Sequence, residues 1–301
     1  MIDQINDPND PLGPTCYQLW ADFDAPGKDG MPTRCVEVWV CRDRAAPWRL
    51  GTYPSAQQAR RGVVDWIATW HAAASAAGKG GWCVMTNQKP RLLDLFCGAG
   101  GCAMGYHRAG FEVVGVDINP QPHYPFEFHQ ADALTYPLEG FDVIHASPPC
   151  QHYAKFSRNL GTAARHPDLV PPMQKRLAGH VYVLENVVGA PLVWPFMLCG
   201  SMFGLHVRRH RLFESPFLQP HLIFAPMACR HDGIPIGVYG NGTTVWHRKK
   251  LGRNVHVAEK REAMGIDWMT GAELKESIPP AYTEWIGRQV LAILQRESEV
   301  A

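Results

Sequence analysis

The chain of 301 residues is long enough to bury one α/β core and a smaller module, and 46% hydrophobic residues is typical of a folded protein. Its net charge of +1 excludes a protein that binds nucleic acid through a uniformly basic surface, so phosphate contacts are expected only from local basic clusters. The N-terminus is polar and no apolar run reaches about eighteen residues, which predicts no signal peptide and no membrane span. We therefore expect a cytoplasmic protein.

The cysteines and histidines do not form a recognisable framework. The nine cysteines are scattered along the chain and show neither a Cys-x-x-Cys pair nor zinc-like spacing, which favours reduced thiols over disulfides. Among 14 histidines, the nearest approach to a metal-ligand cluster is Cys229 with His231 and His221. From this pattern we predict no bound metal.

The N-terminal part of the chain is predicted to form a small appendage. Residues 1–30 are rich in Pro and Asp and are predicted to be disordered, whereas residues 31–76 are predicted to form a β-β-α module. Residues 77–89 are predicted to form a linker, and Met85 could serve as an alternative start. The two strands and the helix of the module are expected over residues 35–41, 48–53 and 55–76.

A glycine-rich turn follows the next predicted strand, in the sequence Arg-Leu-Leu-Asp-Leu-Phe-Cys-Gly-Ala-Gly-Gly at residues 91–101. A helix is expected after it, and this order is how a doubly wound sheet opens a nucleotide-type cofactor site, although a plain tight turn is the alternative. A second strand, residues 111–116, ends in Asp117, where a carboxylate can accept hydrogen bonds from ribose hydroxyls. The pattern Gly-x-Gly-Gly favours S-adenosylmethionine over a dinucleotide. Asp132, where the next strand should end, could accept from an adenine amino group.

A cysteine follows the apolar strand predicted over residues 141–146. The intervening Ser-Pro-Pro ends the strand, because proline cannot donate to a sheet and its φ angle is fixed. Cys150 is thereby directed beyond the carboxyl edge of the sheet. A thiol there can act as a nucleophile, and the alternative is a buried structural cysteine.

These motifs, in this order, resemble those of DNA cytosine-5 methyltransferases over about residues 90–294. The resemblance implies a doubly wound, Rossmann-like α/β sheet that methylates carbon 5 of cytosine through a covalent cysteine adduct on a flipped-out base. It implies a catalytic domain over residues 90–212 and 256–301, with a target-recognition region over residues 213–255. The matching motifs lie at residues 94–101, 117, 132, 148–151, 185–187, 209–211 and 261–265, with a closing helix over 280–294.

The resemblance also implies roles for individual residues. The catalytic residues would be Cys150 as nucleophile, Glu185 as the acid at ring nitrogen 3, and Arg209 and Arg211 as groups that favour the thiolate and hold the base and its phosphates. S-adenosylmethionine would contact Asp94, Phe96, Gly98, Gly100, Gly101, Asp117, Ile118, Asp132, Ala133 and Pro148. DNA would contact Gln151, Lys155, Ser157, Arg158, Arg248, Lys249 and Lys250. The implied partner is double-stranded DNA, bound by a monomer.

Two segments are expected to contact the DNA. The polar, basic stretch after Cys150 is interpreted as a mobile loop that closes on DNA, or as an ordinary surface loop. The recognition region is short, which predicts a short site or relaxed specificity. Residues 236–239 and 243–246 are predicted to form a β-hairpin, and the basic residues 247–253 to form a loop that contacts phosphates or is merely solvated.

The sequence departs from the family pattern at Val207, in the spacing between Cys150 and residues 156–157, and at residues 277–280. An RNA cytosine-5 methyltransferase and a non-catalytic DNA-binding regulator remain alternative readings. Glu185 could instead be a strand-end carboxylate that caps a turn. The sequence leaves open whether the protein accompanies a restriction enzyme, acts alone or protects a phage.

Overall fold

The structure is a computed structural model that describes residues 3–7, 15–26, 32–42, 48–53, 89–216, 218, 229–239 and 243–300. The chain divides into two compact units. One comprises Met1–Trp82 with Gln219–His221, and the other comprises Cys83–Leu218 with Leu222–Ala301. Among the described helices, none combines the length and the apolarity needed to cross a membrane.

The N-terminal unit contains a four-stranded antiparallel sheet in the order β1-β2-β3-β4. Two of its strands lie within residues 1–30, so the prediction of disorder is wrong for residues 3–7 and 15–26. Tyr17 and Leu19 flank the polar Gln18, and Ala21 and Phe23 flank Asp22, so a partial period of two favours a strand despite the flanking Pro and Asp. The helix predicted over 55–76 and most of the predicted linker lie outside the described residues. The strands are β1 (Asp3–Asp7), β2 (Thr15–Pro26), β3 (Pro32–Arg42) and β4 (Trp48–Tyr53).

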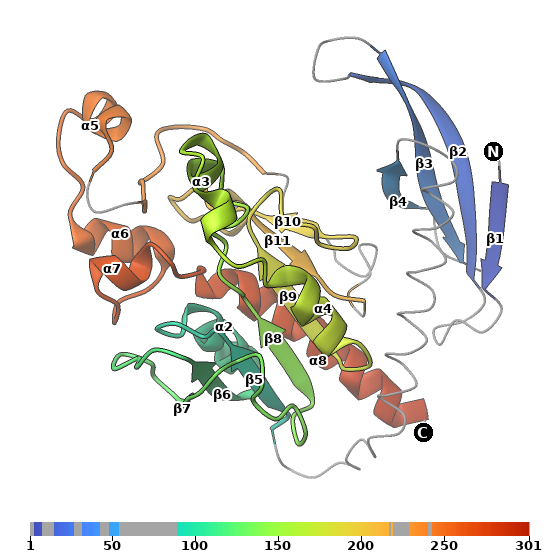
Figure 1. Cartoon of the computed structure of the whole chain (residues 1–301), viewed down its shortest axis with the longest axis horizontal. Coiled ribbons are helices and arrows are strands. Elements are labelled where there is room, and N and C mark those ends of the chain that lie inside the picture. Colours follow the sequence, from blue (N-terminus) through green and yellow to red (C-terminus); the bar gives the residue numbers. More distant parts are fainter. Residues whose placement is uncertain are drawn as a thin grey trace. The chain divides into compact units, whose positions relative to one another are not determined.

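The second unit is built on a seven-stranded sheet in the order β10-β11-β9-β8-β5-β6-β7 (Figure 1). β5 to β9 are parallel, β11 runs antiparallel to β9, and β10 runs antiparallel to β11. The predicted α/β fold with a doubly wound sheet is confirmed. The strands are β5 (Arg91–Leu95), β6 (Glu112–Asp117), β7 (Glu127–Gln130), β8 (Val143–Ala146), β9 (Tyr182–Asn186), β10 (Phe196–Leu198) and β11 (Arg211–Glu214).

Helices cover both faces of this sheet, with α4 in front and α8 behind in the view of Figure 1. Central strands such as β8 are buried along their whole length, as expected for a parallel sheet covered on both faces. The helices are α2 (Gly101–Ala109), α3 (Lys155–Asn159), α4 (Val170–Leu177), α5 (Val245–Leu251), α6 (Val257–Met264), α7 (Gly271–Leu274) and α8 (Pro280–Val300), with 3-10 helices η1 (Ala163–Arg165) and η2 (Gly200–Phe203).

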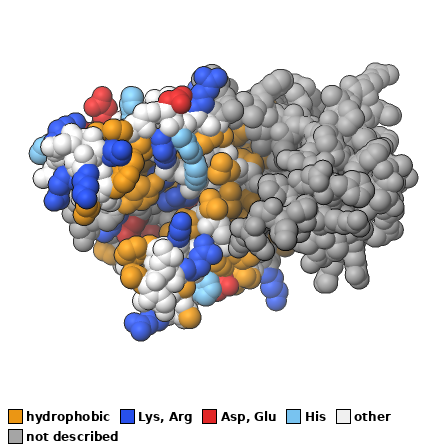
Figure 2. All heavy atoms as spheres, turned by 90° about the horizontal axis from the view of Figure 1, so that it is seen from above, with side chains coloured by type: hydrophobic (Ala, Val, Ile, Leu, Met, Phe, Trp, Pro, Cys, Tyr) orange, Lys and Arg blue, Asp and Glu red, His pale blue; other side chains and the backbone are white. Residues whose placement is uncertain are grey.

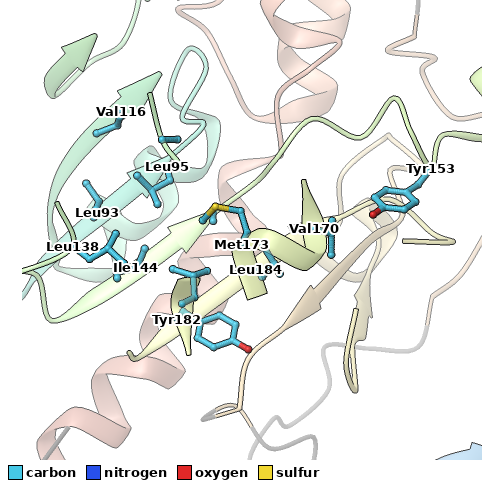
Figure 3. Packing of buried hydrophobic residues seen from close by; sticks show 13 residues of the cluster. Leu93, Leu95, Val116, Leu138, Ile144, Tyr153, Val170, Met173, Tyr182 and Leu184 are labelled. Carbon is cyan, nitrogen blue, oxygen red and sulfur yellow. The ribbon is translucent and has the colours of Figure 1, made fainter. Parts of the chain in front are cut away.

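The two faces differ in what they bury. On the α4 face, Leu93, Ile144 and Tyr182 lie side by side on neighbouring strands and pack with Met173 of α4 in one apolar cluster (Figure 3). On the other face, the buried His145 ring lies 3.0 Å from the hydroxyl of Tyr106 in α2. Burial lowers the pKa of His145 to about 3, so the imidazole is neutral.

The strand order places two functional loops next to each other. From β5 the chain continues to β6 and β7 on one side, and then crosses to β8 and β9 on the other. β5 and β8 are therefore adjacent strands at the topological switch point, where ligands bind in this kind of sheet. The glycine-rich turn follows β5, and the Pro-Pro-Cys segment follows β8.

Two predicted segments have a different structure from the one expected. The predicted hairpin is wrong, because residues 236–239 form no strand and Thr244 caps α5 by accepting a hydrogen bond from the His247 N–H at 3.3 Å. The basic residues predicted as a loop therefore lie mostly on α5. The segment after Cys150 is not simply a loop, because residues 155–159 form the short helix α3.

The helices α2 and α8 pack closely because Gly105 has no side chain. A Cβ atom at Gly105 would lie 2.1 Å from the Thr283 hydroxyl and 2.2 Å from the Pro280 carbonyl oxygen. The Thr283 hydroxyl also donates to the Cys102 carbonyl oxygen at 2.8 Å. The start of α8 is thus fixed on the helix that follows the glycine-rich turn.

Replacing Gly105 with Ala is expected to destabilise the protein, although Ala is the better helix former. Forcing a methyl group against backbone and hydroxyl atoms costs about 1–3 kcal/mol of unfolding free energy. Urea denaturation measures this change. Arg108→Ala on the same helix is the control, since its exposed side chain should matter by less than about 0.5 kcal/mol. A Gly105→Ala variant as stable as the wild type would contradict the close packing.

Candidate active site

The Cys150 segment is anchored to the glycine-rich turn. The Ser147 N–H donates to the Leu95 carbonyl oxygen at 3.2 Å, and the Ser147 hydroxyl donates to that of Phe96 at 3.3 Å. After the two prolines, the Cys150 carbonyl oxygen accepts from the N–H groups of Tyr153 and Ala154, at 3.0 and 2.9 Å. Cys150 itself is partly exposed at the carboxyl edge of the sheet. The predicted direction of this cysteine fits its place in the structure.

Asn186 joins this segment to the neighbouring strand, and sequence reasoning missed its role. Its side-chain amide donates to the Pro148 carbonyl oxygen at 3.0 Å, and its side-chain oxygen accepts from the Val187 N–H at 2.9 Å. The residue is completely buried. The feature of the sequence that could have indicated this role is the position of Asn186 directly after Glu185 in the Glu-Asn-Val motif.

Glu185 is buried near the end of β9 and forms an ion pair with Arg211. The Arg211 Nε and the Glu185 Oε1 atoms are 3.0 Å apart, but the N–H does not point at the oxygen, so the contact is ionic without an aligned hydrogen bond. Phe213 pairs with Glu185 across the sheet, which places Arg211 diagonally opposite the carboxyl group on the same face. Burial raises the pKa of Glu185 to about 7, and the charges of Arg211 and Arg209 partly oppose this rise.

The same charges act on Cys150. Burial raises the pKa of its thiol, Arg211 and Arg209 lower it, and Glu185 raises it. Cys150 follows β8, and Glu185 and Arg211 lie in contact at the adjoining ends of the neighbouring strands β9 and β11. The expected positive charge is present, but burial outweighs it, so the resting sulfur is a thiol.

Arg209 lies in a different place from the one predicted for a residue that holds phosphates. It is 2% exposed, and its guanidinium donates to the carbonyl oxygens of Val238 at 3.2 Å and Lys275 at 2.6 Å. Burial and the neighbouring Arg211 lower the pKa of Arg209 to about 9. Arg209 therefore links its own segment to those of Val238 and Lys275. Because its guanidinium is buried and bonded to the backbone, it cannot reach solvent-exposed phosphates.

The glycine-rich turn has the open backbone expected of a cofactor site. Gly98 adopts a φ of +49°, and a Cβ atom there would meet nothing within 4 Å. The Gly98 N–H donates to the Asp117 carboxylate at 3.1 Å, and the Asn119 N–H donates to its other oxygen at 2.9 Å. Each Asp117 oxygen keeps accepting capacity for a further donor. Phe96 has an unusual φ of +59°, which turns the chain sharply after β5.

The other predicted cofactor residues vary in exposure. Ile118 is 65% exposed next to Asp117, and Asp132 is exposed while one of its oxygens accepts from the Leu134 N–H at 2.9 Å. Ala133 is buried. Asp94 lies inside β5 below the turn rather than on it, and burial raises the pKa of its carboxyl well above the usual range. Pro148 and Gly100 are buried, and so is Gly101, the first residue of α2.

The predicted DNA contacts are mostly at the surface. Gln151, Lys155 and Arg158 are exposed, whereas Ser157 is 7% exposed and points away from solvent. On α5, the side chains of residues 248–250 are exposed. Figure 2 shows Lys and Arg side chains spread over the visible face of the described part and alternating with hydrophobic ones. The basic residues therefore do not form a single continuous patch on this face.

A comparison with protein families identifies the segment that carries the cofactor turn, Cys150 and Glu185. Residues 90–190 match the model of the C-5 cytosine-specific DNA methylases. The match covers about a third of the chain, and it agrees with the family resemblance read from the sequence for these residues.

Parts of the chain are also similar to individual proteins. The Type II methyltransferase M.AgeI of Thalassovita gelatinovora is 27% identical over 120 residues, which cover 33% of this chain and 28% of that protein. An E. coli protein described as a prophage-encoded DNA modification methyltransferase covers 69% of this chain and 100% of its own, with 15% identity and a TM-score of 0.47. The S. pombe Dnmt2 methyltransferase covers 70% and 99%, with 13% identity and a TM-score of 0.44.

Replacing Asn186 with Asp is expected to destabilise the segment that matches the DNA methylases. Aspartate keeps the acceptor for the Val187 N–H, but it cannot donate to the Pro148 carbonyl oxygen. Leaving that buried acceptor without a partner costs about 1–3 kcal/mol of unfolding free energy, measurable by urea denaturation at pH 7. The exposed Asn119→Asp serves as the control, with an expected change below about 0.5 kcal/mol. Equal stability of the two variants would speak against the Asn186 bond.

Replacing Glu185 with Gln is expected to change how stability depends on pH. The carboxyl has a pKa of about 7 in the folded protein against an ordinary value of 4.5, so the wild type loses stability as pH rises through this window. The amide does not ionise. The unfolding free energy of the variant relative to the wild type should therefore rise by about 2–3 kcal/mol between pH 5 and pH 8.

Urea denaturation at both pH values measures this double difference. Glu112→Gln is the control, because the Glu112 side chain is 55% exposed and its replacement should leave the difference within about 0.5 kcal/mol. A relative stability of Glu185→Gln that falls or stays level with rising pH would be inconsistent with a buried, neutral carboxyl group.

Proposed function

We propose that this protein methylates carbon 5 of cytosine in double-stranded DNA, with Cys150 as nucleophile and Glu185 as acid. The observation that carries the proposal is the arrangement of Cys150, Glu185 and Arg211 at one sheet edge, beside a glycine-rich turn in a segment that matches the DNA methylase family. A thiol, a neutral carboxyl and a guanidinium at one place are the groups that activation of a cytosine ring requires. Each of them has a separate part in the reaction.

The residues around the glycine-rich turn fit S-adenosylmethionine. The open space at Gly98 lets a ligand approach the backbone, and the Asp117 carboxylate retains capacity to accept from ribose hydroxyls. The exposed Ile118 and the sharply turned Phe96 offer apolar surface to a planar base, and Asp132 offers an exposed acceptor. When bound, S-adenosylmethionine supplies an electrophilic methyl group on a sulfonium sulfur.

The protein's own residues would make cytosine reactive toward that methyl group. The Cys150 thiol releases its proton to solvent and its sulfur bonds to ring carbon 6, while Glu185 gives a proton to ring nitrogen 3, so that carbon 5 becomes nucleophilic and can take the methyl group. A pKa of about 7 leaves a large fraction of Glu185 protonated at neutral pH, as this role needs. Arg211 stabilises both the thiolate and the carboxylate that form. Once carbon 5 carries the methyl group, its proton passes to solvent, the sulfur leaves carbon 6 as the Cys150 thiolate, and the nitrogen 3 proton returns to Glu185, which restores the aromatic ring.

Access to a stacked base requires it to be flipped out of the duplex, at a cost of about a few kcal/mol. We infer that Gln151, Lys155 and Arg158, which follow the nucleophile and are exposed, contact the DNA around the extruded base. The exposed basic residues 248–250 on α5 are suited to phosphate contacts, which position DNA without reading its sequence. Residues 213–255 would read a short target, and the protein would act as a monomer.

Replacing Cys150 with Ser is expected to abolish the activity. Transfer of tritiated methyl groups to cytosine-containing DNA should fall at least about a thousandfold, because the nucleophile is lost. The wild type, and not the variant, should form a covalent complex with DNA that contains 5-fluorocytosine. Cys41→Ser in the N-terminal unit is the control and should retain transfer.

The substrate is tested in the same assay. DNA should accept methyl groups and tRNA should not, and bisulfite sequencing of DNA from expressing cells gives the target sequence. Full transfer by Cys150→Ser would reject the nucleophile, and transfer to tRNA alone would reject DNA as substrate.

A further inference from the structure

Two cysteines and two histidines converge at the beginning of β11. The ligand atoms of Cys199, His210, Cys229 and His231 all lie within 4.8 Å of one another. Leu198 of β10 pairs with Arg211 of β11, so Cys199 and His210 are the next residues on these two antiparallel strands and face each other. Cys229 and His231 lie further along the chain, in residues 229–239, which form no helix or strand.

The distances within this cluster resemble those of a tetrahedral zinc site. The Nε2 atoms of His210 and His231 are 3.1 Å apart, the Cys229 sulfur lies 3.5 Å from His210 Nε2, and the Cys199 sulfur lies 3.7 Å from His231 Nε2. Tetrahedral zinc with Zn–N of about 2.0–2.1 Å and Zn–S of about 2.3 Å requires about 3.3 Å between nitrogens and about 3.6 Å between nitrogen and sulfur. The Cys229 sulfur and His231 Nε2, 2.8 Å apart, would separate by about 0.8 Å to meet this geometry.

The chemical nature of the ligands favours zinc over other ions. Two sulfurs and two imidazole nitrogens, with no carboxylate among them, are a soft set that selects zinc rather than magnesium or calcium. Without an ion, the two thiols would offer only weak donors to the imidazole nitrogens.

The surroundings of the cluster also suit two thiolates. The Ser201 hydroxyl lies 3.3 Å from the Cys199 sulfur and 3.8 Å from the Cys229 sulfur, so it can donate to a ligand from outside the site. The Arg230 N–H donates to that hydroxyl at 3.2 Å and thereby fixes it. The Arg208 guanidinium, which donates to the carbonyl oxygens of His231 and Gly233, adds positive charge near the sulfurs.

We propose that Cys199, His210, Cys229 and His231 bind one structural zinc ion. All four protein ligands are present, so no coordination position is left open for substrate, as in structural rather than catalytic zinc sites. The ion would fasten the segment at residues 229–233 to the beginning of β11, one residue before Arg211. A metal could not be predicted from the sequence, because the spacing of the four residues follows no zinc motif and they meet only in the folded chain.

The zinc content of the full-length protein tests this proposal independently of any methyl transfer. The protein is purified through a tag without histidine, in reducing buffer without chelator, from zinc-supplemented medium. Inductively coupled plasma mass spectrometry should find about one zinc per chain in the wild type. The double variant Cys229→Ser/His231→Asn should hold at least about tenfold less, whereas the exposed His107→Asn should hold as much as the wild type.

Cobalt gives a second measurement that does not depend on the folding of the variant. Chelator-treated wild type should develop the visible absorption of tetrahedral cobalt with thiolate ligands when Co²⁺ is added, and zinc should displace it. Wild-type protein without zinc, equal zinc in the double variant, or a cobalt spectrum of octahedral type would each overturn the proposal. A Cys199–Cys229 disulfide found by mass spectrometry in the reducing buffer would overturn it as well.

Discussion

The hydrogen bond from the Asn186 amide to the Pro148 carbonyl oxygen holds the ends of β8 and β9 in register at the point where the candidate chemistry lies. The two prolines have no N–H to continue the ladder, and the Asn186 amide provides the donor that the buried Pro148 carbonyl oxygen needs. Ser147 makes the corresponding links to β5 and the glycine-rich turn. The carboxyl ends of the adjacent parallel strands β5, β8 and β9 are thereby linked. These links fix the positions of the Cys150 segment, the Glu185 strand and the glycine-rich turn relative to one another.

Burial determines the protonation of the Glu185 carboxyl and the Cys150 thiol at the ends of these strands. It raises the pKa values of both Glu185 and Cys150, and Arg211 opposes both changes. Both acids thus depend on the Arg211 guanidinium. Ionisation of the Glu185 carboxyl disfavours ionisation of the Cys150 thiol, and the reverse also holds. Near pH 7 the Cys150 thiol is neutral, whereas a pKa of about 7 leaves Glu185 divided between its neutral form and the carboxylate that pairs with Arg211.

The parallel strands that carry the site could be predicted from the sequence, because each is a short apolar run bounded by Gly, Pro or a charged residue. The order of motifs also predicted which loops meet at the switch point. Contacts that depend on side-chain geometry could not be predicted: Arg209 is buried against the backbone of Val238 and Lys275, residues far away in sequence. Residues 236–246 were misjudged for a local reason, since β-branched residues next to glycine suggest a hairpin while Thr244 is a strong helix cap. In residues 1–30, the local richness in Pro and Asp concealed the alternating pattern of β2.

Residues 206–209 form no helix or strand, but hydrogen bonds to two other parts of the chain fix them in place. Residues 206–209 make a series of bonds to the chain between 231 and 239: the Ile236 N–H donates to the His206 carbonyl oxygen at 2.7 Å, and the Tyr239 hydroxyl donates to that of Arg208 at 2.6 Å. The Tyr282 hydroxyl of α8 donates to the Arg209 carbonyl oxygen at 2.7 Å, so the same four residues are also fixed to the helix that packs on α2. Because these bonds replace a β-ladder, the segment needs no strand to remain ordered. Residues 231–239 are thus bonded to the residues that directly precede Arg211, the ion-pair partner of Glu185.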